Sequence, residues 1–192
     1  EKIEFTANKI EYEFQTGQKG LQEFTFKEES GRLIGIMGGS GSGKSTLLNV
    51  LNGNYAPSVG EIRINGIVLY ESPEILEGVI GFVPQDDLLI EELTVFENLF
   101  YNAKLCFGNY NDDKIIELVD QVLFSIGLHE AKDLKVGSPL AKTISGGQRK
   151  RLNIALELIR EPAILFVDEP TSGLSSNDSE IIMDLLKILA LK

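Results

Sequence analysis

The feature that most constrains this chain is a glycine-rich segment between an apolar run and a helix-forming stretch. It reads Gly38-Gly39-Ser40-Gly41-Ser42-Gly43-Lys44-Ser45-Thr46 and fits the pattern Gly, any four residues, Gly, Lys, then Ser or Thr. We expect a strand over 33–37 before it and a helix over 44–52 after it. Backbone N–H groups can converge on a phosphate only where no Cβ blocks the approach, and a helix N-terminus adds partial positive charge. The segment therefore predicts a strand–loop–helix unit that holds the phosphates of a nucleotide.

Two side chains of this segment have defined expected roles. We expect the Lys44 amine to reach the β- and γ-phosphates and the Ser45 hydroxyl to bind Mg²⁺. The alternative is an ordinary flexible glycine loop, which would leave the Lys-Ser pair and the flanking strand as coincidences.

A second apolar run, 164–167, ends in two acids, Asp168 and Glu169. Where a fold contains a phosphate-binding loop, a neighbouring strand delivers one carboxylate to the metal, so we expect Asp168 to bind Mg²⁺. Glu169 follows at the strand tip and is expected to orient and partly deprotonate the attacking water. Alone, the two acids would indicate a charged turn; together with the glycine-rich loop, they favour the metal site.

The hydrophobic pattern divides the chain into an α/β core and an inserted helical region. Compact apolar runs are typical of a parallel sheet covered on both faces, and they occur at 33–37, 79–83 and 164–167. Alternating segments predict shorter antiparallel strands, with turns at 16–17 and 65–66; they lie at 3–5, 10–14, 21–26, 61–64 and 67–70. Helical spacing is found over 93–128, 146–160 and 179–192.

Composition excludes several other classes of protein. With 43% apolar and 24% charged residues, the 192-residue chain is expected to form one globular domain. The net charge of −11 argues against non-specific nucleic-acid binding, which needs phosphate neutralisation. The single cysteine, Cys106, excludes an internal disulfide and suits a reducing compartment. No apolar run approaches the ~18 residues that a membrane helix needs.

A third element resembles a known family. Ser145-Gly146-Gly147-Gln148 begins the helix expected over 146–160, and a serine hydroxyl with two glycine amides at a helix start can hold an anion. Preceded by Ile144, it resembles the signature motif of the nucleotide-binding domain of ATP-binding cassette (ABC) transporters, with isoleucine where leucine is usual. The glycine-rich loop and the strand at 164–169 match the same family.

The resemblance implies roles for further residues. Gln85 stands where the family's Q-loop glutamine contacts Mg²⁺ and the attacking water. Tyr12 stands where an aromatic ring stacks on adenine, with an ordinary strand tyrosine as the alternative. The signature residues Ser145, Gly146, Gly147 and Gln148 would contact the ATP held by a second copy. Three stretches resemble the G-type exporters: Pro84-Gln85-Asp86-Asp87, 93–99 and 147–152.

The resemblance also implies a fold. This is a P-loop NTPase with a RecA-like parallel sheet core, an N-terminal antiparallel β subdomain and an inserted helical subdomain, truncated at its C-terminal side. The ATP-binding core would comprise 1–90 and 151–192, and the helical subdomain 91–150. The chain begins without methionine and ends inside an expected helix, so we expect it to be a piece of a longer polypeptide.

The implied function is the binding and hydrolysis of MgATP in a two-fold dimer with a second nucleotide-binding domain, identical or different. Hydrolysis would drive transport through a transmembrane domain in the same longer chain, which the segment 85–99 would contact. The domain, itself soluble, would then lie at the cytoplasmic face of the membrane and bind no nucleic acid. We expect the isolated chain to have weak ATPase activity or none.

The sequence departs from the family at one loop. Ser175 stands where the D-loop usually carries aspartate, which puts coupling or the hydrolysis rate in doubt, and the family's switch histidine would lie beyond Lys192. His129 is expected at a surface or helix end, and Cys106 as a small buried apolar side chain. Arg149-Lys150-Arg151 is expected to be the exposed face of its helix rather than a phosphate or lipid patch.

Two alternative functions remain open from the sequence. One is a soluble ABC ATPase that acts on ribosomes or chromosomes, which the acidic, uninterrupted chain disfavours. The other is a non-hydrolysing ATP-sensing module, which Ser175 and the missing histidine make plausible.

Overall fold

The computed structural model describes the chain except for residues 1, 72–73, 75, 77, 139–142 and 192. Its internal contacts divide the chain into two compact units. One unit comprises Glu1–Phe82, Ala163–Asp168 and Leu186–Lys192, and the other comprises Val83–Pro162 and Glu169–Leu185. This division follows contacts within the chain, and the functional boundaries expected at 91–150 stay a prediction.

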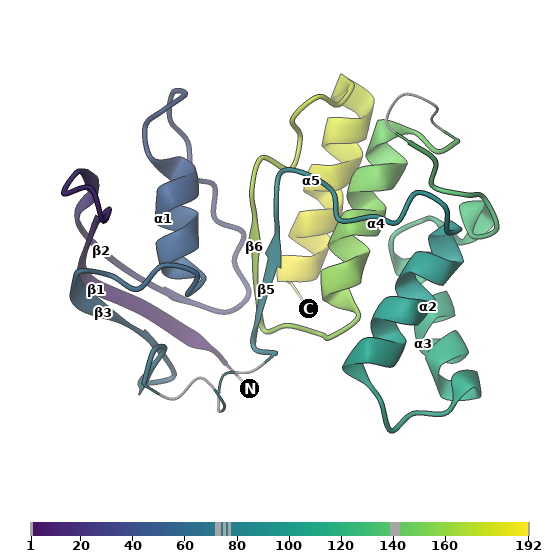
Figure 1. Ribbon diagram of the computed structural model, residues 1–192, viewed down its shortest axis with the longest axis horizontal. Coiled ribbons are helices and arrows are strands. Elements are labelled where there is room, and N and C mark those ends of the chain that lie inside the picture. Colours follow the sequence, from purple (N-terminus) through teal and green to yellow (C-terminus); the bar gives the residue numbers. More distant parts are fainter. Residues whose placement is uncertain (1, 72–73, 75, 77, 139–142, 192) are drawn as a thin grey trace. The chain divides into compact units, whose positions relative to one another are not determined.

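An antiparallel sheet makes up much of the first unit (Figure 1). β1 (Glu4–Glu13) pairs with β2 (Lys19–Glu29) on one side and with β3 (Val59–Ile64) on the other, and β4 (Ile67–Val68) pairs with β3. Asn65 and Gly66, both with positive φ, form the tight turn between β3 and β4. The expected antiparallel strands are confirmed, although the segments 3–5 and 10–14 fall largely within one continuous strand.

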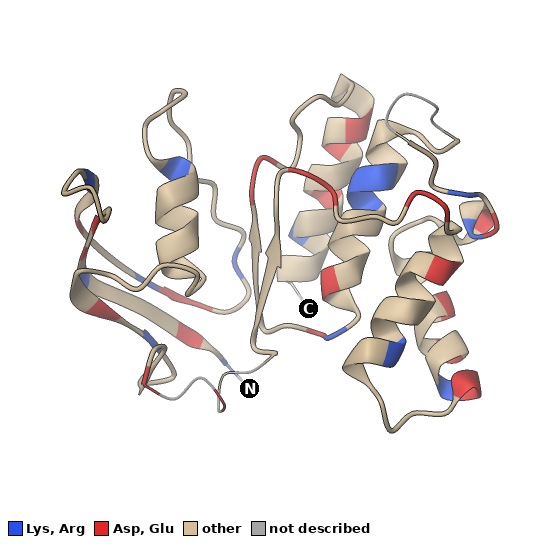
Figure 2. Cartoon of the chain, viewed as in Figure 1, with Lys and Arg blue, Asp and Glu red and all other residues tan. Residues whose placement is uncertain are grey.

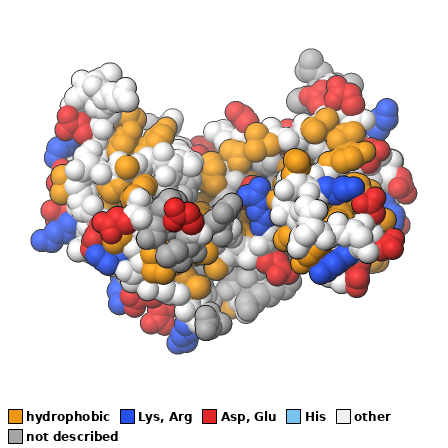
Figure 3. Space-filling model, turned by 60° about the horizontal axis from the view of Figure 1, so that its bottom comes forward, with side chains coloured by type: hydrophobic (Ala, Val, Ile, Leu, Met, Phe, Trp, Pro, Cys, Tyr) orange, Lys and Arg blue, Asp and Glu red, His pale blue; other side chains and the backbone are white. Residues whose placement is uncertain are grey.

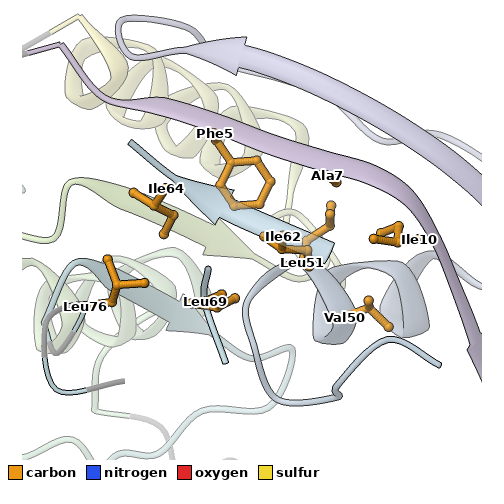
Figure 4. Close-up of a cluster of buried hydrophobic side chains, with 9 residues drawn as sticks. All are labelled: Phe5, Ala7, Ile10, Val50, Leu51, Ile62, Ile64, Leu69 and Leu76. Atoms are coloured by element: carbon orange, nitrogen blue, oxygen red, sulfur yellow. The ribbon is translucent and has the colours of Figure 1, made fainter. Parts of the chain in front are cut away.

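The core of this unit lies between the sheet and the helix α1 (Lys44–Leu51). Residues two apart on a strand share a face, so one face of β1 and one face of β3 are apolar. The buried cluster consists of Phe5, Ala7, Ile10, Val50, Leu51, Ile62, Ile64, Leu69 and Leu76 (Figure 4). Each large side chain that is buried here contributes about 1.5–3 kcal/mol relative to exposure. The cluster therefore anchors α1, and with it the glycine-rich loop that precedes the helix.

A second sheet contains two strands, β5 (Ile80–Val83) and β6 (Ile164–Val167), whose arrows point the same way in Figure 1. The Ile164 N–H donates a hydrogen bond of 3.0 Å to the Val79 carbonyl at the start of this pair. Two of the three expected compact strands, at 79–83 and 164–167, are confirmed.

The prediction of a third compact strand, over 33–37, is wrong. In the described part of the chain no strand pairs with this run, and it has no regular secondary structure. Its apolar side chains Leu33, Ile34, Ile36 and Met37 are exposed, Met37 by 95%. A strand needs a neighbour for its backbone groups. An apolar composition does not by itself provide a neighbouring strand. The segment before the glycine-rich loop is therefore unpaired, although its composition is that of a strand.

The second unit is mainly helical. Its elements are α2 (Val95–Cys106), α3 (Asp112–Ser125), the short 3₁₀ helix η1 (His129–Ala131), α4 (Gly146–Leu158) and most of α5 (Ser176–Ala190). A capping box starts α2, because the Thr94 hydroxyl accepts from the Glu97 N–H at 3.0 Å and the Glu97 carboxylate accepts from the Thr94 N–H at 2.8 Å. The helices expected over 93–128, 146–160 and 179–192 are confirmed, with a break after Cys106 and an end at Ala190; residue 192 lies outside the described residues.

Charged and apolar side chains are both exposed on this chain. Acidic residues are spread over α2 and α3, and a basic stretch lies near the start of α4 (Figure 2). Figure 3 shows hydrophobic side chains open on the surface among charged ones. None of the helices in the described residues is long and apolar enough to span a membrane.

Candidate nucleotide-binding site

The glycine-rich loop curls around the lysine that follows it. Lys44 Nζ donates hydrogen bonds to the Gly38 carbonyl at 2.9 Å and to the Gly39 carbonyl at 2.8 Å. Gly41 and Gly43 have φ values of 75° and 89°, a left-handed conformation that L side chains rarely adopt. A Cβ at Gly38 would lie 2.6 Å from the Ser42 hydroxyl oxygen. The loop thus needs glycine for its shape, and its lysine lies directly over it.

Two oxygen groups of the first unit are suitable for Mg²⁺. Ser45 is exposed in the first turn of α1, and Asp168 follows the last residue of β6. Hydroxyl and carboxylate oxygens, together with phosphate oxygens, form the ligand set that Mg²⁺ prefers. Among the described residues, no hydrogen bond or ion pair joins the Asp168 carboxylate to the loop. That these two residues share a metal ion stays a prediction.

An aromatic cluster lies beside the phosphate loop in the same unit. The Tyr12 ring stacks on Tyr55, with ring centroids 5.2 Å apart and planes at 13°, and meets the edge of Phe14 at 5.1 Å. A Cβ at Gly20 would lie 2.6 Å from the Phe14 ring and 3.0 Å from the Tyr12 ring, and one at Gly43 would lie 3.4 Å from the Gly20 carbonyl oxygen. Gly20 therefore brings the rings close to the end of the loop. The structure does not test whether Tyr12 contacts a base, and sequence reasoning missed Tyr55.

The signature motif forms the start of α4 in the second unit. The Ser145 hydroxyl accepts from the Gln148 N–H at 3.1 Å, and the Gln148 side-chain oxygen accepts from the Ser145 N–H at 2.7 Å. Ser145 is exposed, whereas the preceding Ile144 is buried and fills the position of the usual leucine. This capping box leaves the serine hydroxyl hydrogen free to be donated to an anion.

The segment that contains Gln85 is held to α4 by two basic residues. The Arg149 guanidinium forms an ion pair with Asp87, with Nε 2.9 Å from Oδ2. Lys150 Nζ donates to the Pro84 carbonyl at 3.1 Å and to the Gln85 carbonyl at 3.3 Å. The Gln85 side chain itself is exposed. The signature helix and the Gln85 segment are therefore joined within one unit.

The expectation that Arg149-Lys150-Arg151 is an exposed helix face is wrong. Arg149 is only 5% exposed and Lys150 only 9%, because each finds acceptors on a neighbouring segment. Arg151 donates to the Ile126 and Gly127 carbonyls at 3.0 and 3.2 Å, and burial lowers the pKa of its guanidinium. The three side chains anchor α4 to other segments of its unit.

Glu169 is exposed and has a left-handed backbone with φ 42°. Its carbonyl accepts a hydrogen bond from the Ser172 N–H at 3.1 Å, which starts a turn directly after β6. Glutamate has no intrinsic preference for this conformation, and such residues are concentrated at functional sites. The geometry is compatible with the expected catalytic role without testing it.

Two residues outside the motifs also have clear positions. His129 lies at the start of η1 with its ring stacked on Phe124 at 3.8 Å, which agrees with a helix-end role. Cys106 is only half-buried, and its sulfur accepts from Arg160 Nε at 3.1 Å, so the expected role as a small buried apolar side chain is wrong.

Comparison with known proteins agrees with the fold and the loop. The structure of cbiO1 from Clostridium perfringens, described as part of the ABC transporter complex cbiONQ, matches with a TM-score of 0.85 and 30% identity over 97% of this chain and 73% of that one. The fold and the loop thus define a P-loop NTPase, as expected.

Sequence comparison identifies the family. The ABC transporter family model matches residues 21–172. ABC transporter G family member 28 of Arabidopsis thaliana is 43% identical over 88% of this chain, and the ABC-type transporter claG of Penicillium crustosum is 38% identical over 96% of it. The chain belongs to the ABC transporter family, as a nucleotide-binding domain. It spans only 15% and 26% of the length of these two relatives. Because several relatives are G family members, the similarity to the G-type subfamily is confirmed.

Proposed function

We propose that this domain binds MgATP at the glycine-rich loop and hydrolyses it to drive transport. The observation that carries the proposal is the geometry of the loop. Lys44, the first residue of α1, donates from Nζ to the Gly38 and Gly39 carbonyls. An incoming triphosphate can take this amine from the two carbonyls, because a charge-assisted bond to phosphate is stronger than a bond to a neutral carbonyl. The base would stack on Tyr12, and Ser45, Gln85 and Asp168 would hold Mg²⁺.

Hydrolysis needs a second nucleotide-binding domain in this proposal. The exposed Ser145 and the first turn of α4 form an anion-binding helix start on the unit that does not contain the loop. A two-fold dimer, formed with an identical or a similar domain, would let each signature motif cover the ATP on the partner's loop. Glu169 would then activate the water.

A transmembrane partner would contact the segment 85–99. Leu88 is 67% exposed and Ile90 52% exposed, and both lie between Gln85 and α2. Exposed apolar side chains favour contact with another domain. Because the neighbouring segment is joined to the signature helix, such a contact could transmit a movement of that helix to the partner. In such an assembly the domain lies at the cytoplasmic face of a membrane.

The Lys44→Ala variant tests the proposal directly. It removes the positive side chain over the β/γ phosphates, so we expect the Kd for MgATP to rise by about 100-fold or more. Lys27→Ala is the control, because this lysine of the same unit pairs with Glu4 on the surface of the sheet. Binding is measured by calorimetry. Wild-type affinity in Lys44→Ala would overturn the assignment of the loop.

A further inference from the structure

The two signature glycines pack against the segment that follows Glu169. A Cβ built at Gly147 would lie 2.3 Å from Asp178 Oδ1 and 2.9 Å from Asp178 Cβ, and one built at Gly146 would lie 3.3 Å from the Leu174 side chain. Only glycine fits at 147, because any other side chain would have to displace the Asp178 carboxylate. All four residues belong to the same compact unit.

Ser175 determines where this carboxylate lies. Its hydroxyl accepts from the Asp178 N–H at 3.1 Å and donates to Asp178 Oδ2 at 3.0 Å, and its carbonyl accepts from the Ser179 N–H at 2.9 Å. These bonds make Ser175 the N-cap of α5, with Asp178 at the third helical position. The serine thus caps α5, and Asp178 is the acidic residue in the first turn of this helix.

Positive charge on α4 lies near Asp178. The positively charged Arg151 guanidinium of α4 interacts with it electrostatically, and the N-terminus of α4 carries partial positive charge near Gly147. The Asp178 side chain therefore packs directly against the first turn of α4 at Gly147.

We propose that Asp178, oriented by Ser175, is a positioning residue that holds the Ser145–Gln148 turn in the geometry needed to contact ATP on a partner domain. The inference rests on the proposed function, because it assigns Asp178 a role in the same reaction. The contact also ties the signature turn to the loop that begins at Glu169 in the same chain. A movement of the signature turn would therefore be accompanied by a movement of the loop that begins at Glu169.

The first test compares hydrolysis by Asp178→Ala, Asp178→Asn and a control variant in the full-length protein, because the isolated chain is expected to have weak ATPase activity or none. Because a misplaced group costs rate more than ground-state binding, we expect Asp178→Ala to lower kcat by about tenfold and to change the KM for ATP by less than about twofold. Asp178→Asn keeps an oxygen that accepts from Ser175, so it should recover most of the rate. Asp184→Ala, an exposed acid further along α5, should match the wild type.

The second test uses the contact itself. Gly147→Ala puts a methyl group onto the Asp178 carboxylate, although alanine is otherwise the better helix former. Adding Asp178→Gly removes all three Asp178 atoms that the methyl would meet, so we expect the double variant to have a higher kcat than Gly147→Ala alone. A double-mutant cycle measures this coupling.

The outcomes separate this inference from the proposed function. A wild-type protein that neither binds nor hydrolyses ATP overturns the proposed function and the inference with it. If the wild type hydrolyses ATP but Asp178→Ala has the same kcat, or if the two substitutions in the cycle are additive, only the role of Asp178 is overturned. A loss in Asp178→Ala that Asp178→Asn does not recover also overturns it, because the positioning hydrogen bond would then be irrelevant.

Discussion

Arg149 and Asp87 form a two-point ion pair between the start of α4 and the segment after β5. Arg149 Nε lies 2.9 Å from Asp87 Oδ2, and Nη2 lies 3.2 Å from Oδ1. The guanidinium also donates to the Val136 and Gly137 carbonyls, so it is surrounded by acceptors. Together with the hydrogen bond from Lys150 to the Gln85 carbonyl, the ion pair joins the signature helix to the Gln85 segment.

Asp87→Ala should therefore destabilise the fold more than the replacement of a partly exposed aspartate usually does. It leaves the buried Arg149 guanidinium without its carboxylate, and we expect the free energy of unfolding to fall by about 2–3 kcal/mol. Urea denaturation measures the loss. The adjacent, exposed Asp86 provides the control, since Asp86→Ala should stay within about 0.5 kcal/mol of the wild type. Equal stabilities for the two variants would show that the ion pair contributes nothing.

The sequence could predict elements that local pattern specifies. The glycine-rich loop, the α1 helix after it and the β6 strand before Asp168 each combine a hydrophobic period with its own start or stop residues. The capping role of Ser175 was also readable, because Ser-Ser-Asn-Asp places an acid three residues after the cap.

Other features depend on partners far away in the chain, and there the sequence was insufficient. The partner of Arg149 is Asp87, 62 residues earlier, so three adjacent basic residues were mistaken for a solvated helix face. The apolar run at 33–37 has the composition of a buried strand, but no pattern within it shows whether a neighbouring strand is available. The stacking of Tyr55 on Tyr12 is likewise a product of tertiary packing.

Glu169→Gln is expected to separate binding from hydrolysis. The amide keeps the size of the side chain but cannot accept a proton from water, so we expect kcat to fall by about 100-fold or more while ATP still binds. Turnover and calorimetric binding are measured on the same preparations of the full-length protein. Glu161→Gln is a matched control, because Glu161 is also an exposed glutamate with positive φ, 51°. Unchanged turnover in Glu169→Gln would assign water activation to another group.

Tyr12→Ala should weaken binding of the nucleotide through its base. Loss of base–aromatic stacking typically raises Kd by about tenfold, and Tyr12→Phe, which keeps a stacking ring, should bind like the wild type. Inorganic triphosphate lacks a base, so its affinity should not change. Tyr110→Ala, which removes a different stacked ring in the helical unit, controls for general loss of packing. If triphosphate binding weakens as much as ATP binding, Tyr12 acts on the loop and not on the base.

Tyr70 should make stability depend on alkaline pH. Its hydroxyl shares its one hydrogen between the Tyr55 carbonyl, at 2.7 Å, and the Val50 carbonyl, at 3.0 Å, and burial raises its pKa from 10.0 to about 12. The unfolded chain loses this proton near pH 10 while the folded chain keeps it, so the stability is fully present below pH 10 and falls between pH 10 and about 12.

Tyr70→Phe tests this dependence, because it removes the titrating group and keeps the ring. We expect the variant to lose about 1 kcal/mol at neutral pH, from the missing hydrogen bonds, and to have a flatter stability profile above pH 10 than the wild type. Urea denaturation at a series of pH values measures both effects. Tyr101→Phe, at an exposed position on α2, should keep the wild-type profile. An alkaline decline that is equally steep in Tyr70→Phe would mean that other groups cause it.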